Sequence, residues 1–305
     1  MQPTPDWRGF ERVPVTVEDG TVLSAYHVGR RELPAILLVN AFGMPVRFWG
    51  PLARALSDRF FMVSWESRGV PSLDQPFHPD RCSLLDHAGD MRRVAEAFSL
   101  SGALAVAWCT GCQVALRCAA MPAPPIAGAV LLCGAYCLPD GRWTSQYGRN
   151  MKTIAKHCAR SVAHAGAFSD ILMSAAHKGS GSTQPAIGQA IPAEVLDMTM
   201  GPFASGQALY RYAHLQRQFL DPPPETWASE VRLPVLVLGA GKDQIVHPEA
   251  SREIARRLPE AELLMLPEGD HFVHYFDPAV PAAIEDFHAR RLSRSNHPRP
   301  AHRHV

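Results

Sequence analysis

The sequence is notable first for what it lacks. No run of about 18 apolar residues occurs among its 305 residues, which excludes an obvious membrane-spanning helix. It has almost no net charge, +1 at neutral pH, which argues against a general nucleic-acid binder. Residues 1–6 lack the basic and apolar regions of a secretory signal. The seven cysteines are odd in number and irregularly spaced, which predicts reduced thiols and a cytoplasmic protein instead of a disulfide framework.

Strand-like and helix-like segments alternate along the sequence. Hydrophobic residues make up 47% of it, which is enough for an extensive core. A turn at 18–20 joins two short strands into a hairpin. Ser83, with Asp86 three residues later, predicts the start of an amphipathic helix over 84–98. The other expected strands lie at 35–39, 60–65, 127–132, 234–238 and 261–266, and the other helices at 49–56, 248–258 and 278–291. This order predicts an α/β fold with a mostly parallel, doubly wound sheet and an antiparallel edge.

One long segment interrupts the alternation. Residues 139–230 contain helical patches and loops, such as 178–182 and 221–224, but no strand-like run. We therefore expect a helical cap inserted between a first core part at 1–138 and a second at 231–294. The remaining residues, 295–305, are polar and rich in Pro and His, and we expect them to be disordered.

The pentapeptide Ala107-Trp108-Cys109-Thr110-Gly111 is the most informative motif. It follows a short apolar run, 104–107, and precedes a helical pattern at 113–117. A sharp turn between strand and helix, with small residues two positions before and after the centre, is typical of a nucleophile elbow. The usual Gly-x-Ser-x-Gly here reads Ala-x-Cys-x-Gly, so Cys109 is the predicted nucleophile.

A nucleophile needs a base, and the base needs an orienting acid. Asp243 follows the strand predicted at 234–238, and His271 lies in the loop after the strand at 261–266. Both positions face the same edge of a parallel sheet as Cys109, in the chain order nucleophile, acid, base. We therefore predict Asp243 as the acid and His271 as the base, with His274 as the alternative base.

These residues together resemble an α/β-hydrolase-fold enzyme, over about Phe10 to Leu292. Where many members have His-Gly after the third strand, this chain has Asn-Ala-Phe-Gly at 40–43. The resemblance implies an oxyanion hole made by the backbone N–H groups of Phe42 and Thr110. The stretch 65–69, Trp-Glu-Ser-Arg-Gly, matches the family's Asp-x-x-Gly with substitutions and has a structural role there.

A thiol nucleophile favours thioester chemistry. An acyl-cysteine is close in free energy to an acyl group on a pantetheine arm, so exchange between thiols would be nearly isoenergetic if water is excluded. The motifs at 40–45, 65–69 and 108–111 resemble the cysteine-dependent aminoacyl shuttles of nonribosomal peptide pathways, of the syringomycin and coronamic acid type. That resemblance implies acyl transfer between the phosphopantetheine arms of carrier proteins, with no metal or nucleotide cofactor.

Carrier proteins are usually acidic, so their docking surface should be basic. Residues 141–169 contain no Asp or Glu, and four basic residues step by three or four along a predicted helix in the cap: Arg149, Lys152, Lys156 and Arg160. These residues form either a docking face for an acidic partner or an ordinary solvated helix face.

Other interpretations stay open. Trp108-Cys109-Thr110-Gly111-Cys112 is also a Trp-Cys-x-x-Cys motif, as in thiol–disulfide oxidoreductases. In a second interpretation of the same motif, Cys112 supplies only a small side chain where the helix packs against the sheet. Metal binding by Cys109 and Cys112 would need a second pair such as Cys133 and Cys137, although Cys133 ends a predicted core strand. The nearest alternatives are a cysteine hydrolase of the same fold, acting on an ester, thioester or lactone, and an O-acyltransferase.

Overall fold

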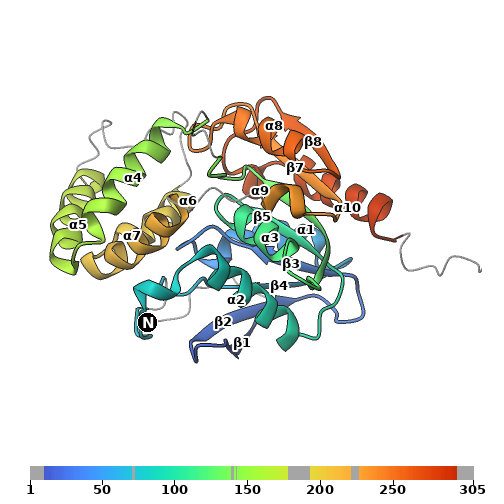
Figure 1. The fold of residues 1–305 in the computed structure, drawn as a ribbon, viewed down its shortest axis with the longest axis horizontal. Helices are drawn as coiled ribbons and strands as arrows, with labels where there is room; N and C mark the ends of the chain where they lie inside the picture. Colours follow the sequence, from blue (N-terminus) through green and yellow to red (C-terminus); the bar gives the residue numbers. More distant parts are fainter. Residues whose placement is uncertain are drawn as a thin grey trace, which may run out of the picture.

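The computed structural model describes residues 10–70, 73–138, 141, 143–177, 193–220 and 227–293. Its centre is an eight-stranded sheet in the order β1-β2-β4-β3-β5-β6-β7-β8 (Figure 1). The strands are β1 (Glu11–Thr16), β2 (Val22–Val28), β3 (Ala35–Val39), β4 (Phe61–Trp65), β5 (Ala103–Trp108), β6 (Ile126–Leu132), β7 (Val235–Ala240) and β8 (Ala261–Leu266). The predicted α/β fold and the strand positions are confirmed.

The sheet is antiparallel only at its first edge. β1 pairs with β2, and β2 with β4, in antiparallel fashion, whereas all pairings from β4 to β8 are parallel. The inner strands β3, β4 and β5 are almost wholly buried, which explains why they appear in the sequence as continuous apolar runs instead of alternating ones. All parallel strands therefore end at one edge, where the chemistry-bearing loops begin.

Helices cover both faces of this sheet. One apolar cluster places α2 (Leu84–Ala97), α3 (Gly111–Ala119) and α8 (Pro248–Arg257) on one face. A second cluster places α1 (Gly50–Leu56) and α10 (Ala279–Arg291) on the other face, with α9 (Val273–Phe276) beside them. α2 begins as predicted, because Ser83 accepts a hydrogen bond from the backbone N–H of Asp86 and the Asp86 carboxylate accepts one from Ser83 in return.

In the described part of the interval expected to form the cap, four α-helices lie between β6 and β7. They are α4 (Gln146–Cys158), α5 (Val162–His177), α6 (Ala193–Met200) and α7 (Gly206–Leu220), and they lie to one side of the sheet (Figure 1). The described part of this interval contains no strand. α5 and α7 approach closely, because a Cβ on Gly206 would lie 2.7 Å from the Cα of Gly166. The predicted loops 178–182 and 221–224, and the tail 295–305, lie outside the described residues.

Residues 65–69 have a structural role, as the resemblance implied. The Arg68 guanidinium binds Asp90 of α2 through two hydrogen bonds, of 2.8 and 2.5 Å, and Asp19 at 2.7 Å. These buried contacts tie the end of β4 to α2 and to the first hairpin. No helix among the described residues is long and apolar enough to cross a bilayer.

Candidate active site

Cys109 occupies the tight turn between β5 and α3. Its φ angle is +51°, a conformation that costs free energy in a residue other than glycine. A Cβ on Gly111, two residues later, would lie 2.3 Å from the carbonyl oxygen of Val39. The second small residue is therefore required because α3 starts directly against the end of β3. The predicted elbow is present in the structure.

Cys112 does not face the same surroundings as Cys109. Its buried thiol donates to the carbonyl of Ala107 at 3.3 Å, so the side chain turns back onto the strand. Burial and the nearby Cys109 raise the pKa of Cys112 well above its usual range. All seven cysteines lie within the described residues, and no disulfide joins any two of them. This geometry fits the packing role of Cys112 better than a dithiol role.

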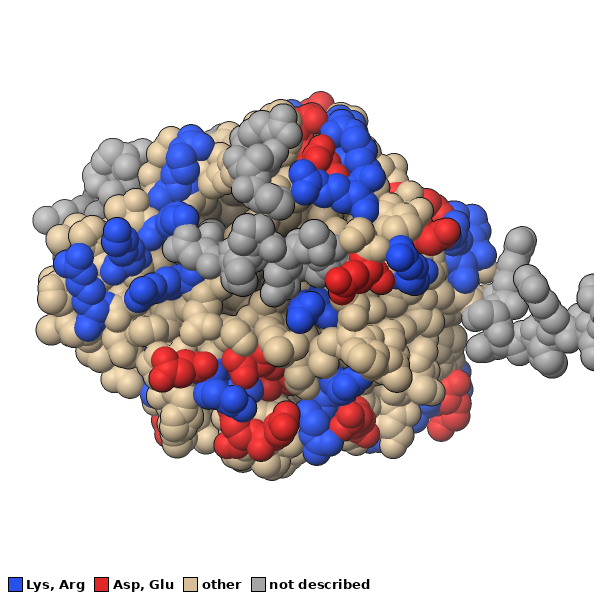
Figure 2. All heavy atoms as spheres, viewed as in Figure 1, with Lys and Arg blue, Asp and Glu red and all other residues tan. Residues whose placement is uncertain are grey.

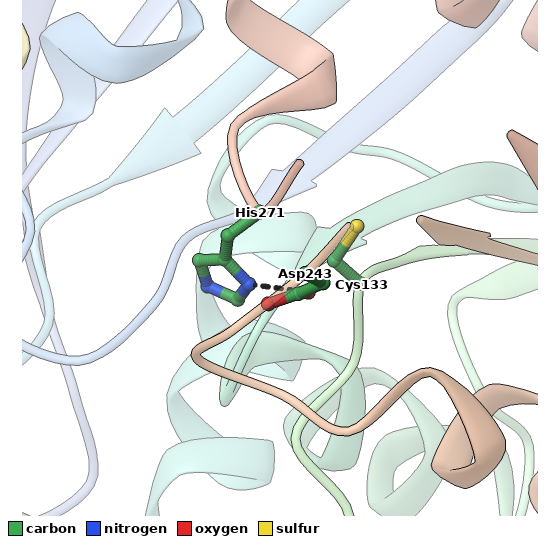
Figure 3. A group of neighbouring side chains, drawn as sticks. All are labelled: Cys133, Asp243 and His271. Carbon is green, nitrogen blue, oxygen red and sulfur yellow. Dashed lines mark hydrogen bonds and ion pairs between the residues drawn. The ribbon is translucent and has the colours of Figure 1, made fainter. Parts of the chain in front are cut away.

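Asp243 and His271 come together at the carboxyl edge of the sheet (Figure 3). The first follows β7 and the second follows β8, and His271 Nδ1 lies 2.8 Å from Asp243 Oδ2. The other carboxylate oxygen of Asp243 accepts hydrogen bonds of 2.8 Å from the backbone N–H groups of Ile245 and Val246. The carboxylate is therefore fixed in one orientation, with one oxygen left for the imidazole.

The electrostatics around His271 favour its protonated form. Burial alone would lower the pKa of this imidazole, but the Asp243 carboxylate and the Cys109 thiol, which is hydrogen-bonded to the ring, outweigh burial and raise the pKa to about 10. The three predicted residues thus form a continuous hydrogen-bonded chain from Cys109 through His271 to Asp243. This arrangement can take a proton from a thiol and hold it on a charged imidazole.

Trp108 couples the nucleophile to the base, a role that the sequence did not reveal. Its indole N–H donates a 2.9 Å hydrogen bond to the carbonyl of His271, although the two residues are 163 positions apart in the chain. The Trp108 and His271 rings also lie 5.3 Å apart, between centroids. The residue before Cys109 therefore holds the loop that carries the base.

The alternative prediction, that His274 is the base, is wrong. Its ring is buried between Trp108 and Trp49, with centroids 4.3 and 5.1 Å away, and neither ring nitrogen has a hydrogen-bond partner. Burial, with a smaller effect from the nearby His271, lowers the pKa of His274 well below its usual range. His274 is therefore a neutral residue of the apolar core.

The loop at 40–45 is expected to supply one oxyanion donor. Hydrogen bonds between the Asn40 side chain and the loop's own backbone hold its conformation. The Asn40 amide donates 2.9 Å hydrogen bonds to the carbonyls of Met44 and Pro45, and its oxygen accepts one from the N–H of Ala41. The predicted donor pair, Phe42 and Thr110, does lie together. However, the Phe42 N–H donates to the Thr110 side-chain hydroxyl at 2.9 Å, so another group already occupies this N–H.

The cap covers this loop. Gly43 has a φ angle of +72°, and a Cβ there would lie 3.0 Å from the ring of Tyr212 on α7. The Tyr212 hydroxyl is hydrogen-bonded to Tyr147 of α4 and to Gln216. Burial raises the pKa of both tyrosines, and the Cys109 thiol is close enough to raise them further. Cap residues thus place neutral hydroxyl groups near the nucleophile.

Cys133, at the end of β6, is a further thiol in this region. Its sulfur, the Asp243 carboxylate and a ring nitrogen of His271 lie within 4.8 Å of one another (Figure 3). Burial and the adjacent Asp243 raise the pKa of Cys133 well above its usual range, so it is a neutral thiol. The His271–Asp243 hydrogen bond already engages the ring nitrogen that faces the carboxylate. Cys133 is the buried core residue at the end of a strand that the sequence predicts, and it also borders the site.

The four basic residues are only partly on one helix. Arg149, Lys152 and Lys156 are exposed on α4, whereas Arg160 is exposed beyond the helix end at Cys158. Figure 2 shows Lys and Arg side chains gathered on the side of the molecule where Figure 1 places the cap helices. The Arg149 guanidinium also donates to Thr144 and Gln146. The prediction of a single helix face is therefore wrong for Arg160, which lies in the turn after α4.

Comparison with known proteins agrees with the observed fold. A model of the alpha/beta hydrolase fold family matches residues 34–278. The chain belongs to the α/β-hydrolase fold family, and it is thus an enzyme of that superfamily.

The relatives of this α/β-hydrolase are distant. A putative carbamate hydrolase, RutD from Caulobacter segnis, is 23% identical over 82% of this chain and 88% of its own. A haloalkane dehalogenase variant from Bradyrhizobium elkanii superposes with a TM-score of 0.73 at 14% identity, over 94% of this chain and 98% of the other. The enol-lactonase from Burkholderia xenovorans gives 0.67 at 19% identity, over 91% and 100%. At these identities the superpositions show the fold alone.

Proposed function

We propose that this α/β-hydrolase is a cysteine-dependent hydrolase that cleaves an ester or thioester through an acyl-cysteine at Cys109. The observation that carries the proposal is the hydrogen-bonded chain Cys109–His271–Asp243, with a 2.8 Å contact between its last two members, next to an elbow that exposes the thiol. A non-catalytic relative would have no need of a strained cysteine aligned with a buried, charged imidazole.

The geometry supports a two-step reaction. In the first step the Cys109 sulfur, whose proton is already held by His271, attacks the carbonyl carbon, and the imidazolium gives that proton to the departing alcohol or thiol. In the second step His271 takes a proton from water, the hydroxide attacks the acyl-cysteine, and the proton goes back to the departing sulfur. Asp243 stays ionised throughout and holds the imidazole in the tautomer that both steps need.

Hydrolysis is the first candidate reaction, ahead of acyl transfer, because of the names of the matched proteins. The matched proteins and structures bear the names of a carbamate hydrolase, an enol-lactonase and epoxide hydrolases, each of which uses water in its reaction. The carrier-protein transfer suggested by the sequence motifs has no counterpart among them.

Transfer between carrier proteins is the second candidate function, and two observations favour it. The nucleophile is a thiol, which makes return of the acyl group to another thiol thermodynamically easy. The exposed charges of Arg149, Lys152 and Lys156 on α4 suit the docking of an acidic partner such as an acyl carrier protein. Neither feature is needed for hydrolysis of a small ester.

The test is intact-mass analysis of the protein mixed with a panel of p-nitrophenyl esters and of acyl and aminoacyl thioesters on a pantetheinylated carrier. We expect an acyl adduct on the wild type and none on Cys109→Ala. An adduct that decays to free acid at the same rate with and without a second carrier identifies the hydrolase. Passage to the second carrier without free acid identifies the transferase. Turnover of any of these acyl donors by Cys109→Ala would overturn the acyl-cysteine mechanism itself.

A matched set of variants tests the docking surface separately. Lys152→Glu and Lys156→Glu reverse the charge of exposed side chains on α4, whereas Arg256→Glu changes an exposed cation on α8, on the core. In the transferase, the α4 variants should raise KM for the carrier substrate and weaken its salt dependence, with kcat for a small ester unchanged. Equal effects at both locations would exclude a docking role for α4.

A further inference from the structure

The oxyanion donor expected from Phe42 is engaged by a side chain. The backbone N–H of Phe42 points at the hydroxyl oxygen of Thr110, 2.9 Å away, in a buried contact between residues 68 positions apart. Thr110 follows the nucleophile directly, and its hydroxyl does not cap the helix α3 that begins at Gly111. The hydroxyl oxygen thus lies where the negatively charged oxygen of a tetrahedral intermediate would have to lie to reach Phe42.

The hydroxyl has a proton of its own to donate. A threonine hydroxyl can accept one hydrogen bond and donate another at the same time. Among the described residues none accepts a hydrogen bond from Thr110 Oγ1, so this proton is not committed within the resting protein. The hydrogen bond that Thr110 Oγ1 accepts from the Phe42 N–H polarises the Thr110 O–H bond. The hydroxyl is then a stronger hydrogen-bond donor, because linked hydrogen bonds reinforce one another.

We infer that the Thr110 hydroxyl is itself a catalytic oxyanion donor, placed between the Phe42 N–H and the substrate. The inference rests on the proposed acyl-cysteine chemistry and adds a residue to it. In the tetrahedral intermediate the hydroxyl donates to the oxyanion and keeps its proton, and the Phe42 N–H supports it from behind. The backbone N–H of Thr110 completes the site. It lies at the N-terminus of α3, where N–H groups have no partner within the helix.

A competing arrangement makes the opposite prediction. If the hydroxyl merely blocked the Phe42 N–H, its removal would free a backbone donor for the oxyanion, and acylation would stay the same or become faster. If the hydroxyl is the donor, its removal takes away stabilisation that exists only in the transition state. Loss of one oxyanion donor typically lowers kcat by about 10²–10³.

The experiment compares Thr110→Val, which keeps the shape of the side chain, with Thr110→Ser, which keeps the hydroxyl. The readout is the rate of Cys109 acylation by p-nitrophenyl acetate and by an acetyl thioester, measured as the burst of leaving group. We expect Thr110→Val to slow acylation by about 10²-fold or more, mainly in kcat and not in KM, and Thr110→Ser to restore most of the rate. Thr110→Ala, which leaves space for water at the Phe42 N–H, serves as the second variant if Val disturbs folding.

Alkylation of Cys109 by iodoacetamide provides the internal control, because this substitution develops no oxyanion. Thr110→Val should therefore alkylate at the wild-type rate while it acylates slowly. Acylation at or above the wild-type rate in Thr110→Val or Thr110→Ala overturns the inference, as does an equal loss in acylation and alkylation. Absence of any Cys109 adduct in the wild type would instead remove the proposed function, and the inference with it.

Discussion

Replacement of Asp243 by Asn tests the proposed mechanism at its most constrained hydrogen bond. The Asp243 oxygen that accepts from Ile245 and Val246 can stay in place as the amide oxygen, so the loop should keep its conformation. The amide N–H₂ then faces His271 Nδ1, where the carboxylate oxygen lay 2.8 Å away. Two donors cannot face each other, so the imidazole must present a lone pair at Nδ1 and carry its proton on Nε2, towards Cys109.

In that tautomer His271 cannot accept the thiol proton. The loss of the carboxylate also removes the principal influence that raises the pKa of His271 to about 10. We expect kcat/KM for acylation to fall by about 10⁴-fold, which corresponds to ~5.4 kcal/mol of transition-state stabilisation. The assay is the pH dependence of acyl-adduct formation, followed by stopped-flow release of p-nitrophenolate.

Asp270→Asn is the matched control for this change. Asp270 precedes the base in the same loop. Among the described residues its carboxylate accepts a hydrogen bond only from the backbone N–H of Phe272, at 2.8 Å, and an amide oxygen can do the same. This variant should acylate within about a factor of three of the wild type, since no charge on the reacting groups is removed. An Asp243→Asn protein that acylates as fast as Asp270→Asn would refute the role of the carboxylate.

Three further changes follow from the same geometry. Gly111→Ala should abolish acylation and destabilise the fold by several kcal/mol, visible in a denaturant titration, because the new Cβ would lie 2.3 Å from the Val39 carbonyl. His274→Phe should keep the wild-type acylation rate and should not lower the melting temperature, since it removes two buried nitrogens without partners; a loss of activity greater than tenfold would reopen its role as base. Because the folded-state pKa of His271 is raised from 6.5 to about 10, its contribution to stability should be complete below pH 6.5 and lost as pH rises through 10. Chemical denaturation across that range should show a smaller alkaline loss in His271→Gln than in the wild type.

The sequence predicts the fold well because the local signals agree with the sheet. Inner strands such as Ala35–Val39 are buried on both sides, so their apolar runs are unbroken, and the Ser83 capping box marks the start of α2 at the residue where it begins. The end of α4 was harder to predict. Nothing in the charge pattern distinguishes Arg160 from Lys156, but the helix ends at Cys158.

The sequence predicts which residues meet at the edge of the sheet, but it does not predict the hydrogen bonds between them. Cys109, Asp243 and His271 each follow a parallel strand, and strand order brings them together without further information. The hydrogen bond from Trp108 to His271 and the one from Phe42 to Thr110 depend on side-chain directions across the sheet. No short-range pattern in the sequence encodes those directions.

The close contact between Tyr212 and Gly43 has a consequence for substitutions. The ring of a cap helix rests on the turn that carries Phe42, and a side chain at position 43 has no room. A substitution at position 43 would therefore displace Tyr212 or the turn itself, so the glycine of this turn and the tyrosine of α7 constrain each other's choice of residue.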